Sequence, residues 1–145
     1  MTEPEHYLDT SALLPYYREE PASKAVEEFL QSLSSPVKVS RLAEAELAAT
    51  LARWVGAGEL DEPQAKLIEH AYLEDLRAGL LDLTPMPPLA YGRARDWLLR
   101  RAVPLDTLDA LHLAACHETG AELITCDEHL HRAAEQLAVR SRLLA

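Results

Sequence analysis

The chain is poor in cysteine and in basic residues, and it has no long apolar run. Its two cysteines, Cys116 and Cys126, form no C-x-x-C pair, so we expect no disulfide framework and a reducing, cytoplasmic location. The 14 lysines and arginines stand against 24 aspartates and glutamates, and the formal net charge of −10 argues against non-specific nucleic-acid binding through a basic surface. No apolar stretch is long enough to span a bilayer, and segment 1–11 lacks the basic start and apolar centre of a signal peptide. We therefore expect a soluble, intracellular protein.

Apolar residues, by contrast, make up 48% of the chain, which excludes disorder as a description of the whole. The length suits a single domain, residues 1–145. Strand-like and helix-like segments alternate, which predicts an α/β fold: a three-layer α/β/α sandwich around a mainly parallel sheet of about five strands. We expect the strands at residues 6–10, 37–40, 80–84, 122–125 and, with the weakest pattern, 137–140.

Helix signals separate these strands. Apolar residues recur at three- and four-residue spacing within segments 26–33 and 43–54, which predicts helices that pack on the sheet. Asp61 and Gln64 resemble a capping box at the start of a helix that runs toward Gly79. Further helices are expected from about residue 89 to 101, from near residue 106 to residue 119 or 120, and from residue 127 onward.

Acidic residues stand at the ends of the predicted strands and in an apolar helix. Asp9 and Asp127 follow the first and fourth strands, and the carboxyl ends of parallel strands meet at one edge of a sheet, where ligands bind. Asp109 lies within the apolar stretch 108–115, and no lysine or arginine follows it until Arg132. A buried carboxylate without a positive partner is costly. The counter-charge is therefore expected from a metal ion.

Three more acidic residues accompany these. Glu44 and Glu46 fall in the first two turns of the helix after strand 37–40, and helical geometry alone does not choose between them. Asp106 stands three residues before Asp109. Converging carboxylates suit hard cations such as Mg²⁺ or Mn²⁺, and two such ions can clamp the attacking and leaving oxygens of a phosphodiester. The residues predict metal-dependent phosphodiester hydrolysis.

Four segments together resemble the PIN domain family, and most closely its VapC-type toxin ribonucleases. They are residues 6–14, 39–47, 105–115 and 123–130, and the likeness runs nearly end to end. The resemblance implies that the catalytic, metal-binding acids are Asp9, Glu46, Asp109 and Asp127. It places accessory hydroxyls near the metals at Thr10, Ser11 and Thr125.

The resemblance also implies an activity and partners. The expected protein is a Mg²⁺- or Mn²⁺-dependent endoribonuclease, the toxin of a type II toxin–antitoxin pair, silenced by a cognate antitoxin across its active-site groove. A homodimer is implied as well. The densest basic run offers contacts for RNA phosphates, although a solvated charged face is the alternative. It consists of Arg93, Arg95, Arg100 and Arg101.

Simpler structural roles stand beside these functional ones. Asp9 and Asp127 are also suited to capping helices, and for Asp106 a helix cap is favoured over a water-mediated metal ligand. His112 is favoured as a hydrogen-bonded core histidine over a catalytic base. A zinc site is disfavoured because the spacing of its candidate ligands matches no usual pattern. These are Cys116, His117, Cys126, His129 and His131.

Two other functions remain as alternatives. An aspartate after the first strand also serves haloacid-dehalogenase-like phosphatases as a covalent nucleophile, which would be Asp9. That class has a second aspartate two residues later, where this chain has Ser11. The other alternative is a non-catalytic PIN-like binding module, and intact acids at all four positions speak against it.

Overall fold

A sheet of five parallel strands organises residues 4–145, the part of the chain that this computed structural model describes. The strands are β1 (His6–Leu8), β2 (Val37–Ser40), β3 (Leu81–Thr84), β4 (Glu122–Thr125) and β5 (Ser141–Leu143). Their order in the sheet is β3-β2-β1-β4-β5. Helical crossovers join successive strands, as a parallel sheet requires.

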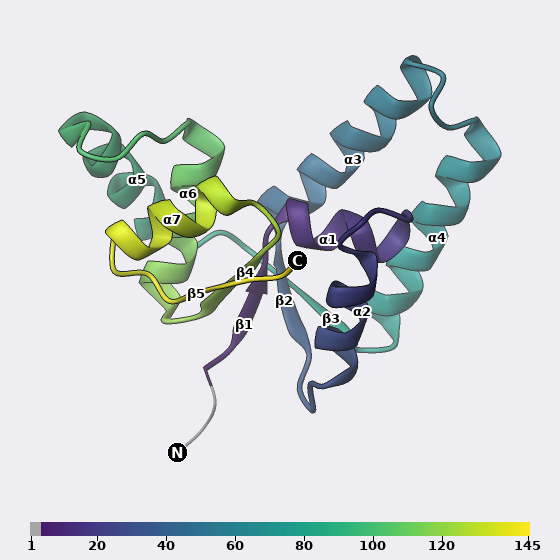
Figure 1. Cartoon of the computed structure of the whole chain (residues 1–145), viewed down its shortest axis with the longest axis horizontal. Helices are drawn as coiled ribbons and strands as arrows, with labels where there is room; N and C mark the ends of the chain where they lie inside the picture. The colour runs from purple at the N-terminus through teal and green to yellow at the C-terminus, as the bar shows by residue number, and fades with distance from the viewer. Residues whose placement is uncertain (1–3) are drawn as a thin grey trace.

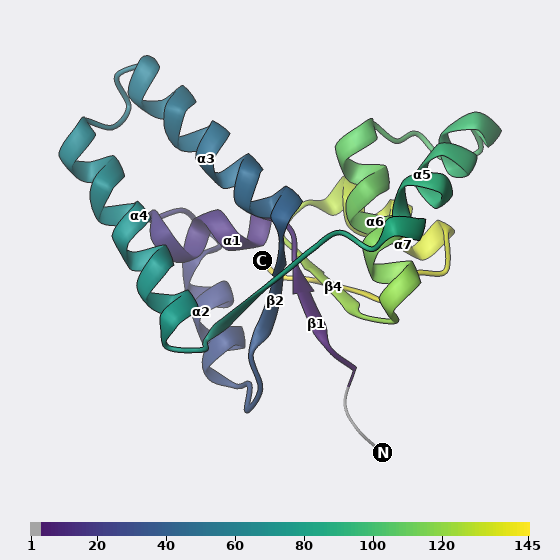
Figure 2. The ribbon, with the colours of Figure 1, turned by 180° about the vertical axis from the view of Figure 1, so that it is seen from behind.

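Within residues 4–145, seven helices cover the two faces of this sheet (Figures 1 and 2). They are α1 (Thr10–Tyr17), α2 (Ser23–Gln31), α3 (Arg41–Gly56), α4 (Glu62–Arg77), α5 (Pro88–Arg100), α6 (Thr107–Thr119) and α7 (Glu128–Gln136). Helices α1 to α4 lie on one face and α5 to α7 on the other. The predicted α/β/α sandwich with a parallel sheet is confirmed. In this same part of the chain, no helix combines the length and apolar character that crossing a membrane requires.

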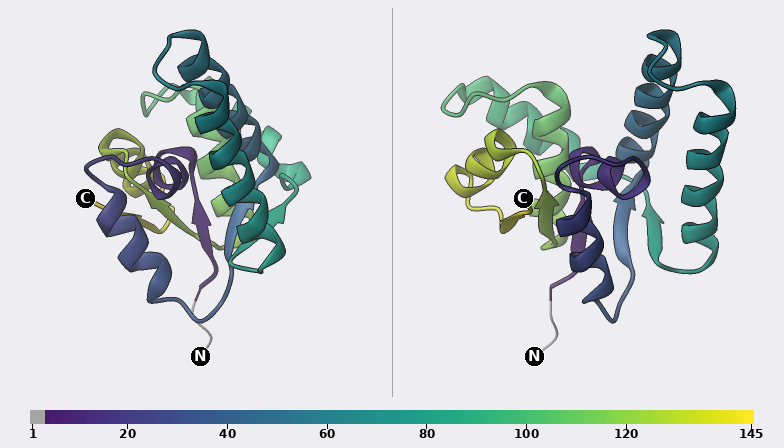
Figure 3. Two further views of the ribbon diagram at one scale, coloured as in Figure 1. Left: turned by 90° about the vertical axis from the view of Figure 1, so that its right-hand side faces the viewer. Right: turned by 45° about the vertical axis from the view of Figure 1, so that its right-hand side comes forward.

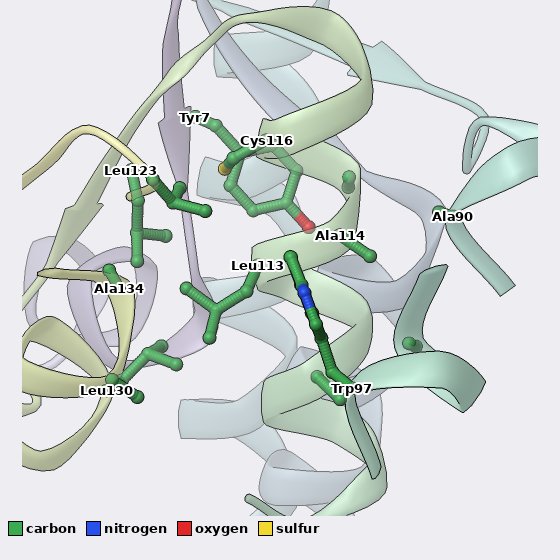
Figure 4. Close-up of a cluster of buried hydrophobic side chains, with 14 of the residues drawn as sticks. Tyr7, Ala90, Trp97, Leu113, Ala114, Cys116, Leu123, Leu130 and Ala134 are labelled. Atoms are coloured by element: carbon green, nitrogen blue, oxygen red, sulfur yellow. The ribbon is translucent and has the colours of Figure 1, made fainter. Parts of the chain in front are cut away.

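Alternating residues of the central strands supply two separate cores. Tyr7 and Leu123 pack with α5, α6 and α7, in a cluster that includes Trp97 (Figure 4). Their neighbours Leu8 and Ile124 pack with α1 to α4 on the opposite face. Successive side chains of a strand point to opposite faces, so strands covered on both sides are apolar throughout. This explains why these strands read as continuous apolar runs in the sequence.

The last strand lies later than the sequence pattern predicts. The pattern places it at residues 137–140, but β5 spans Ser141–Leu143. Leu137 is instead the C-cap of α7, and Ala138 adopts a left-handed conformation with a φ of 58°. The N–H of Val139 donates back to the last turn of α7 at 2.9 Å. The apolar Leu137 and Val139 therefore pack against the core at the end of a helix and not in a strand.

The other four strands match the predicted bounds or differ from them by at most two residues. The first strand ends at Leu8 and not at Thr10, because Asp9 turns the chain into α1. The capping box at the start of α4 forms as predicted. The N–H of Gln64 donates to Asp61 Oδ1 at 2.8 Å, and the N–H of Asp61 donates to Gln64 Oε1 at 2.9 Å.

The helices α3 and α4 extend beyond the sheet as an antiparallel pair (Figure 3). On the other face, α5 and α6 form a second antiparallel pair, because residues 101–106 reverse the chain direction between them. The start of α6 therefore lies beside the end of α5. At the carboxyl edge of the sheet, β1, β2 and β4 lead directly into α1, α3 and α7.

Candidate active site

Asp9 is a nearly buried carboxylate at the carboxyl end of β1, with 4% of its surface exposed. It is the N-cap of α1 and accepts a hydrogen bond from the N–H of Ala12 at 3.2 Å. The hydroxyl of Ser11 lies 2.9 Å from its oxygens, and the hydroxyl of Thr125 donates to Oδ2 at 3.0 Å. Burial raises the pKa of Asp9 to about 6, although nearby His112 and these hydrogen bonds oppose the rise.

Hydroxyl groups connect Asp9 to the start of α7. Ser11 Oγ accepts the N–H of Cys126 at 3.0 Å, and Thr125 Oγ1 accepts the N–H of Asp127 at 3.0 Å. Asp127 in turn caps α7 with two hydrogen bonds to Oδ1, at 2.8 and 3.2 Å. The same two hydroxyls thus hold the ends of β1 and β4 together. Asp9 and Asp127 both cap helices, which is the structural role that the sequence also suggested for them.

The structure separates the two glutamates that the sequence left open. Glu46 accepts a hydrogen bond from the hydroxyl of Thr10 at 2.8 Å and lies 2.5 Å from His112 Nε2. Glu44 instead accepts from the hydroxyl of Tyr72 in α4 at 2.8 Å. Glu46 is therefore on the side of α3 that meets the first turn of α1, next to Asp9, while Glu44 contacts α4.

Asp109 lies in the first turn of α6 and is half-buried. The side chain of Asp106 caps this helix by accepting the N–H of Asp109 at 2.8 Å. Burial raises the pKa of Asp109, and the negative charges of Asp106 and Asp127 raise it further. The predicted cap role of Asp106 is confirmed.

No lysine or arginine among residues 4–145 forms an ion pair with Asp9, Glu46, Asp109 or Asp127, although His112 contacts Glu46. Carboxylate oxygens are the ligands that Mg²⁺ and Mn²⁺ prefer. In the same part of the chain, no three His, Cys, Asp or Glu side chains form a ready cluster for a metal ion. The donors fit an ion held directly by one or two carboxylates, with water completing its shell, which is the usual mode for Mg²⁺. The cysteines and histidines considered for a zinc site also form no such cluster among residues 4–145.

The four predicted RNA-binding arginines are not equivalent. Arg93 donates to Glu118, near the C-terminal end of α6, at 2.7 Å. Arg95 pairs with its neighbour Asp96 at 3.1 Å. Arg100 and Arg101 are exposed at the other end of α5, beside the start of α6 that carries Asp109. Only the last two lie at the end of the helix pair where the acids are.

The sequence alone does not predict which buried residues contact Glu46. His112, which is 3% exposed, is the hydrogen-bonded core histidine that we expected, but its partners are Glu46 and Tyr7. The hydroxyl of Tyr7 also lies 2.8 Å from that of Ser40. These partners are separated by 33 to 105 residues. No local pattern in the sequence signals such contacts.

Several solved structures have a fold similar to that of this chain. VapBC2 from Rickettsia felis, bound to a DNA fragment from its promoter, matches with a TM-score of 0.73 and 15% identity, covering 97% of this chain and 98% of the matched chain. FitAcB from Neisseria gonorrhoeae matches with a TM-score of 0.69 and 22% identity over 94% and 95%. VapC20 from Mycobacterium tuberculosis, a toxin that cleaves the sarcin-ricin loop, matches with a TM-score of 0.67 and 15% identity over 89% and 95%. These likenesses concern the fold.

Comparison of the amino-acid sequence with family models identifies the family. No curated relative matches it significantly. The family model of the PIN domain, however, matches residues 6–136, which include all the segments that carry the acids described above. The fold and this match agree over nearly the whole chain, and the chain belongs to the PIN domain family.

Proposed function

We propose that this protein is a Mg²⁺- or Mn²⁺-dependent endoribonuclease, a single-domain cytoplasmic hydrolase and the toxin of a type II toxin–antitoxin pair. One observation carries the proposal. Carboxyl groups from four separate segments of a PIN-family fold lie at or near the starts of α1, α3, α6 and α7, and no arginine or lysine among residues 4–145 forms an ion pair with them. The similar fold of VapC20, a toxin that cleaves the sarcin-ricin loop, supports RNA as the substrate.

The metal site is assigned to Asp9, Glu46, Asp109 and Asp127. When bound there, a divalent ion would activate the attacking water and stabilise the charge that develops on the phosphate oxygens. The chain's own residues prepare this site. Thr10, Ser11 and Thr125 orient the carboxylates through the hydrogen bonds described above, and the near-complete burial of Asp9 keeps its surroundings low in water. Asp106 serves as a cap for α6.

The substrate requires positive charge near these acids, because the chain carries a net charge of −10. Arg100 and Arg101 are the candidates that lie at the correct end of α5, and they would hold RNA phosphates beside the cleavage site. Arg93 is instead engaged by Glu118. We therefore propose that RNA phosphates contact Arg100 and Arg101, at the C-terminal end of α5, and not Arg93.

A protein inhibitor is part of the proposal, since an unrestrained ribonuclease would damage its own cell. The structures of VapBC2 and FitAcB support a cognate antitoxin as that inhibitor. An arginine of the antitoxin could enter among the unpaired carboxylates, where its charge would replace that of the metal. A homodimer remains part of the proposal on the likeness to the family.

The phosphatase alternative is less well supported. Asp9 would have to attack a phosphoryl group as a nucleophile. Its exposure is only 4%, and its two oxygens accept hydrogen bonds from Ala12, Thr125 and Ser11. Ser11, in the position where a second aspartate would be needed, is one of these donors. Such a carboxylate is arranged to bind a cation more readily than to reach an external phosphorus atom.

RNA cleavage by the purified protein tests the proposal. Cleavage is expected with Mg²⁺ or Mn²⁺ and is expected to stop in excess chelator. Asp9→Asn, Glu46→Gln and Asp109→Asn should each lower the rate by more than about 100-fold, beyond the loss that outer-shell changes cause. Glu44→Gln is the matched control, because Glu44 contacts Tyr72 and not the site. Equal cleavage by wild type and Asp9→Asn would exclude the mechanism.

The chemistry of the ends provides a second criterion. Attack by water should leave a 5′-phosphate and a 3′-hydroxyl, whereas a 2′,3′-cyclic phosphate would show attack by the neighbouring 2′-hydroxyl. Sequencing RNA ends after a short pulse of expression would also identify the target. Transfer of a labelled phosphoryl group to the protein would instead favour the phosphatase.

A further inference from the structure

A chain of hydrogen-bonded side chains runs from the sheet to Glu46. Ser40, the last residue of β2 and the N-cap of α3, lies 2.8 Å from the hydroxyl of Tyr7 in β1. This hydroxyl lies 2.6 Å from His112 Nδ1 in α6, and His112 Nε2 lies 2.5 Å from Glu46 Oε1 in α3. The first three side chains are 1 to 3% exposed. Four elements on both faces of the sheet therefore meet in one polar network within otherwise apolar cores.

Only one arrangement of hydrogens in a neutral imidazole satisfies every member of this network. A Glu46 carboxylate can only accept, so His112 Nε2 must donate, and Nδ1 is then an acceptor for the hydroxyl of Tyr7. Tyr7 has then used its proton and must accept from Ser40. Ser40 is free to donate because its oxygen accepts the N–H of Ala43 at 3.1 Å. Each donor thus fixes the next, and the direction runs from Ser40 to Glu46.

The network constrains one oxygen of Glu46 and leaves the other available. Thr10 and His112 both donate to Oε1, while within residues 4–145 Oε2 has no hydrogen-bond partner. Because both hydrogen bonds end on Oε1, they hold the Glu46 carboxylate in one orientation.

We propose that His112 is a positioning residue of the active site: Tyr7 and Ser40 fix its imidazole, and the imidazole holds the Glu46 carboxylate ready for the metal ion. This inference rests on the proposed function, and it gives a role to three residues that are not among the four acids of the site. Outer-shell partners that orient metal ligands commonly change metal affinity by about 10- to 100-fold when they are removed. His112 itself need not touch the ion or the RNA.

Metal affinity without RNA is the direct test. Titration calorimetry with Mn²⁺ is expected to give a dissociation constant about 10- to 100-fold weaker for His112→Leu than for wild type. Tyr7→Phe, which leaves His112 in place but removes the donor to Nδ1, should give a smaller loss. His112→Gln should recover part of the affinity, since a Gln amide can donate near the position of Nε2. His117→Gln, on the same helix but against Trp97 and Glu118, is the matched control and should bind as wild type does.

Two measurements separate positioning from a general effect on the fold. In a Glu46→Gln background, His112→Leu should add no further loss of affinity, because the interaction through which it acts is already removed. Nitrogen NMR of the apo protein should show the hydrogen of His112 on Nε2 in wild type. Independent losses from the two substitutions, or a hydrogen on Nδ1 of the neutral ring, would overturn the inference.

The outcomes also distinguish this inference from the proposed function. If wild type did not bind Mn²⁺ at all, both would fail. If wild type bound Mn²⁺ and cut RNA while folded His112→Leu and Tyr7→Phe proteins bound the ion equally well, only the positioning role would be wrong.

Discussion

At the residue scale, Asp9 combines a structural cost with a proposed metal-binding role. Its carboxyl group is 4% exposed and has no basic ion-pair partner among residues 4–145. Hydrogen bonds from Ser11, Ala12 and Thr125 satisfy its oxygens but do not remove the cost of burying a charge. The free energy needed to keep this carboxylate ionised would be recovered when a cation binds. The metal-free protein should therefore be less stable than its packing alone would allow.

The pH dependence of stability tests this view. The pKa of Asp9, about 6 in the folded state against an ordinary value of 3.8, means that the folded protein binds this proton more tightly than the unfolded chain. The contribution of Asp9 to stability is then present at low pH and is lost as the pH rises from about 4 to 6. Asp9→Asn removes the charge and keeps a cap acceptor. In chelator it should exceed wild type by about 1–3 kcal/mol at pH 8 and by much less near pH 4.

Urea unfolding at pH 4, 6 and 8 measures this difference. The same preparation should fail to cut RNA, so that stability and activity change in opposite directions. A lower stability of Asp9→Asn at pH 8 would contradict the assignment of Asp9 as a buried, uncompensated charge.

The site residues that could be predicted are those marked by their immediate neighbours in the sequence. Asp9, Asp109 and Asp127 stand out because each interrupts or ends an apolar segment, which is a local property. The choice of Glu46 over Glu44 rested on resemblance, since both lie on the flanks of one helical stripe. Its structural basis is the placement of Tyr72 and His112 on opposite sides of α3. Such contacts between distant segments depend on the complete fold.

At the element scale, two substitutions of Asp106 can distinguish a role in helix capping from a role in metal binding. Its side chain accepts the N–H of Asp109 at the start of α6. Asp106→Asn keeps an oxygen for that hydrogen bond, whereas Asp106→Ala removes it. We expect Asp106→Ala to lower the free energy of unfolding by about 1 kcal/mol and Asp106→Asn to change it little. Chemical denaturation of both variants, beside their Mn²⁺ affinity, gives the comparison.

The two variants should bind Mn²⁺ as wild type does if the residue only caps the helix. A tenfold loss of affinity in Asp106→Asn, with stability unchanged, would instead make it a metal-site residue.

The last turn of α5 is the element expected to meet RNA. Arg100→Gln and Arg101→Gln should each raise the KM for RNA with little change in kcat. Each should also reduce the slope of log affinity against log salt by about 0.7, the value for one phosphate contact on a single strand. Arg93→Gln is the control, because that guanidinium is bound to Glu118 at the far end of α6. Binding measured over a range of salt concentrations would contradict the assignment if all three variants behaved alike.

Elements were predictable where their signals are local. The capping box at Asp61 and the strand at Val37–Ser40 are encoded in a few adjacent residues, and the structure has them as expected. The fifth strand was misplaced because Leu137 and Val139 are apolar for another reason, which is packing at the end of α7. Strand β5 itself has a partly exposed, mixed sequence, Ser141–Leu143. Its position depends on pairing with β4, which no short window reveals.

At the scale of the whole molecule, the parallel sheet explains how the proposed metal site is compatible with a stable fold. The sheet separates two apolar cores, and its carboxyl edge gathers the starts of α1, α3 and α7. Helix N-termini carry partial positive charge, which favours carboxylates in the first turn. The fold therefore offsets part of the repulsion among the acids by itself. A divalent ion would offset the remaining repulsion among the acids.

Metal binding should consequently stabilise the entire molecule. A ligand that binds only the folded state at 100 times its dissociation constant adds about 2.7 kcal/mol, which for a chain of this size raises Tm by roughly 5–10 °C. Thermal unfolding at pH 8 with Mn²⁺ and with chelator should show this difference for wild type. Asp109→Asn should lose most of it. Asp61→Asn makes the same charge change at the cap of α4, outside the site, and should keep the full shift.

Below about pH 6 the wild-type shift should shrink, because protons compete with the ion for Asp9. An equal rise in Tm for Asp109→Asn and Asp61→Asn would mean that Mn²⁺ acts on the general negative charge of the protein and not at this edge of the sheet.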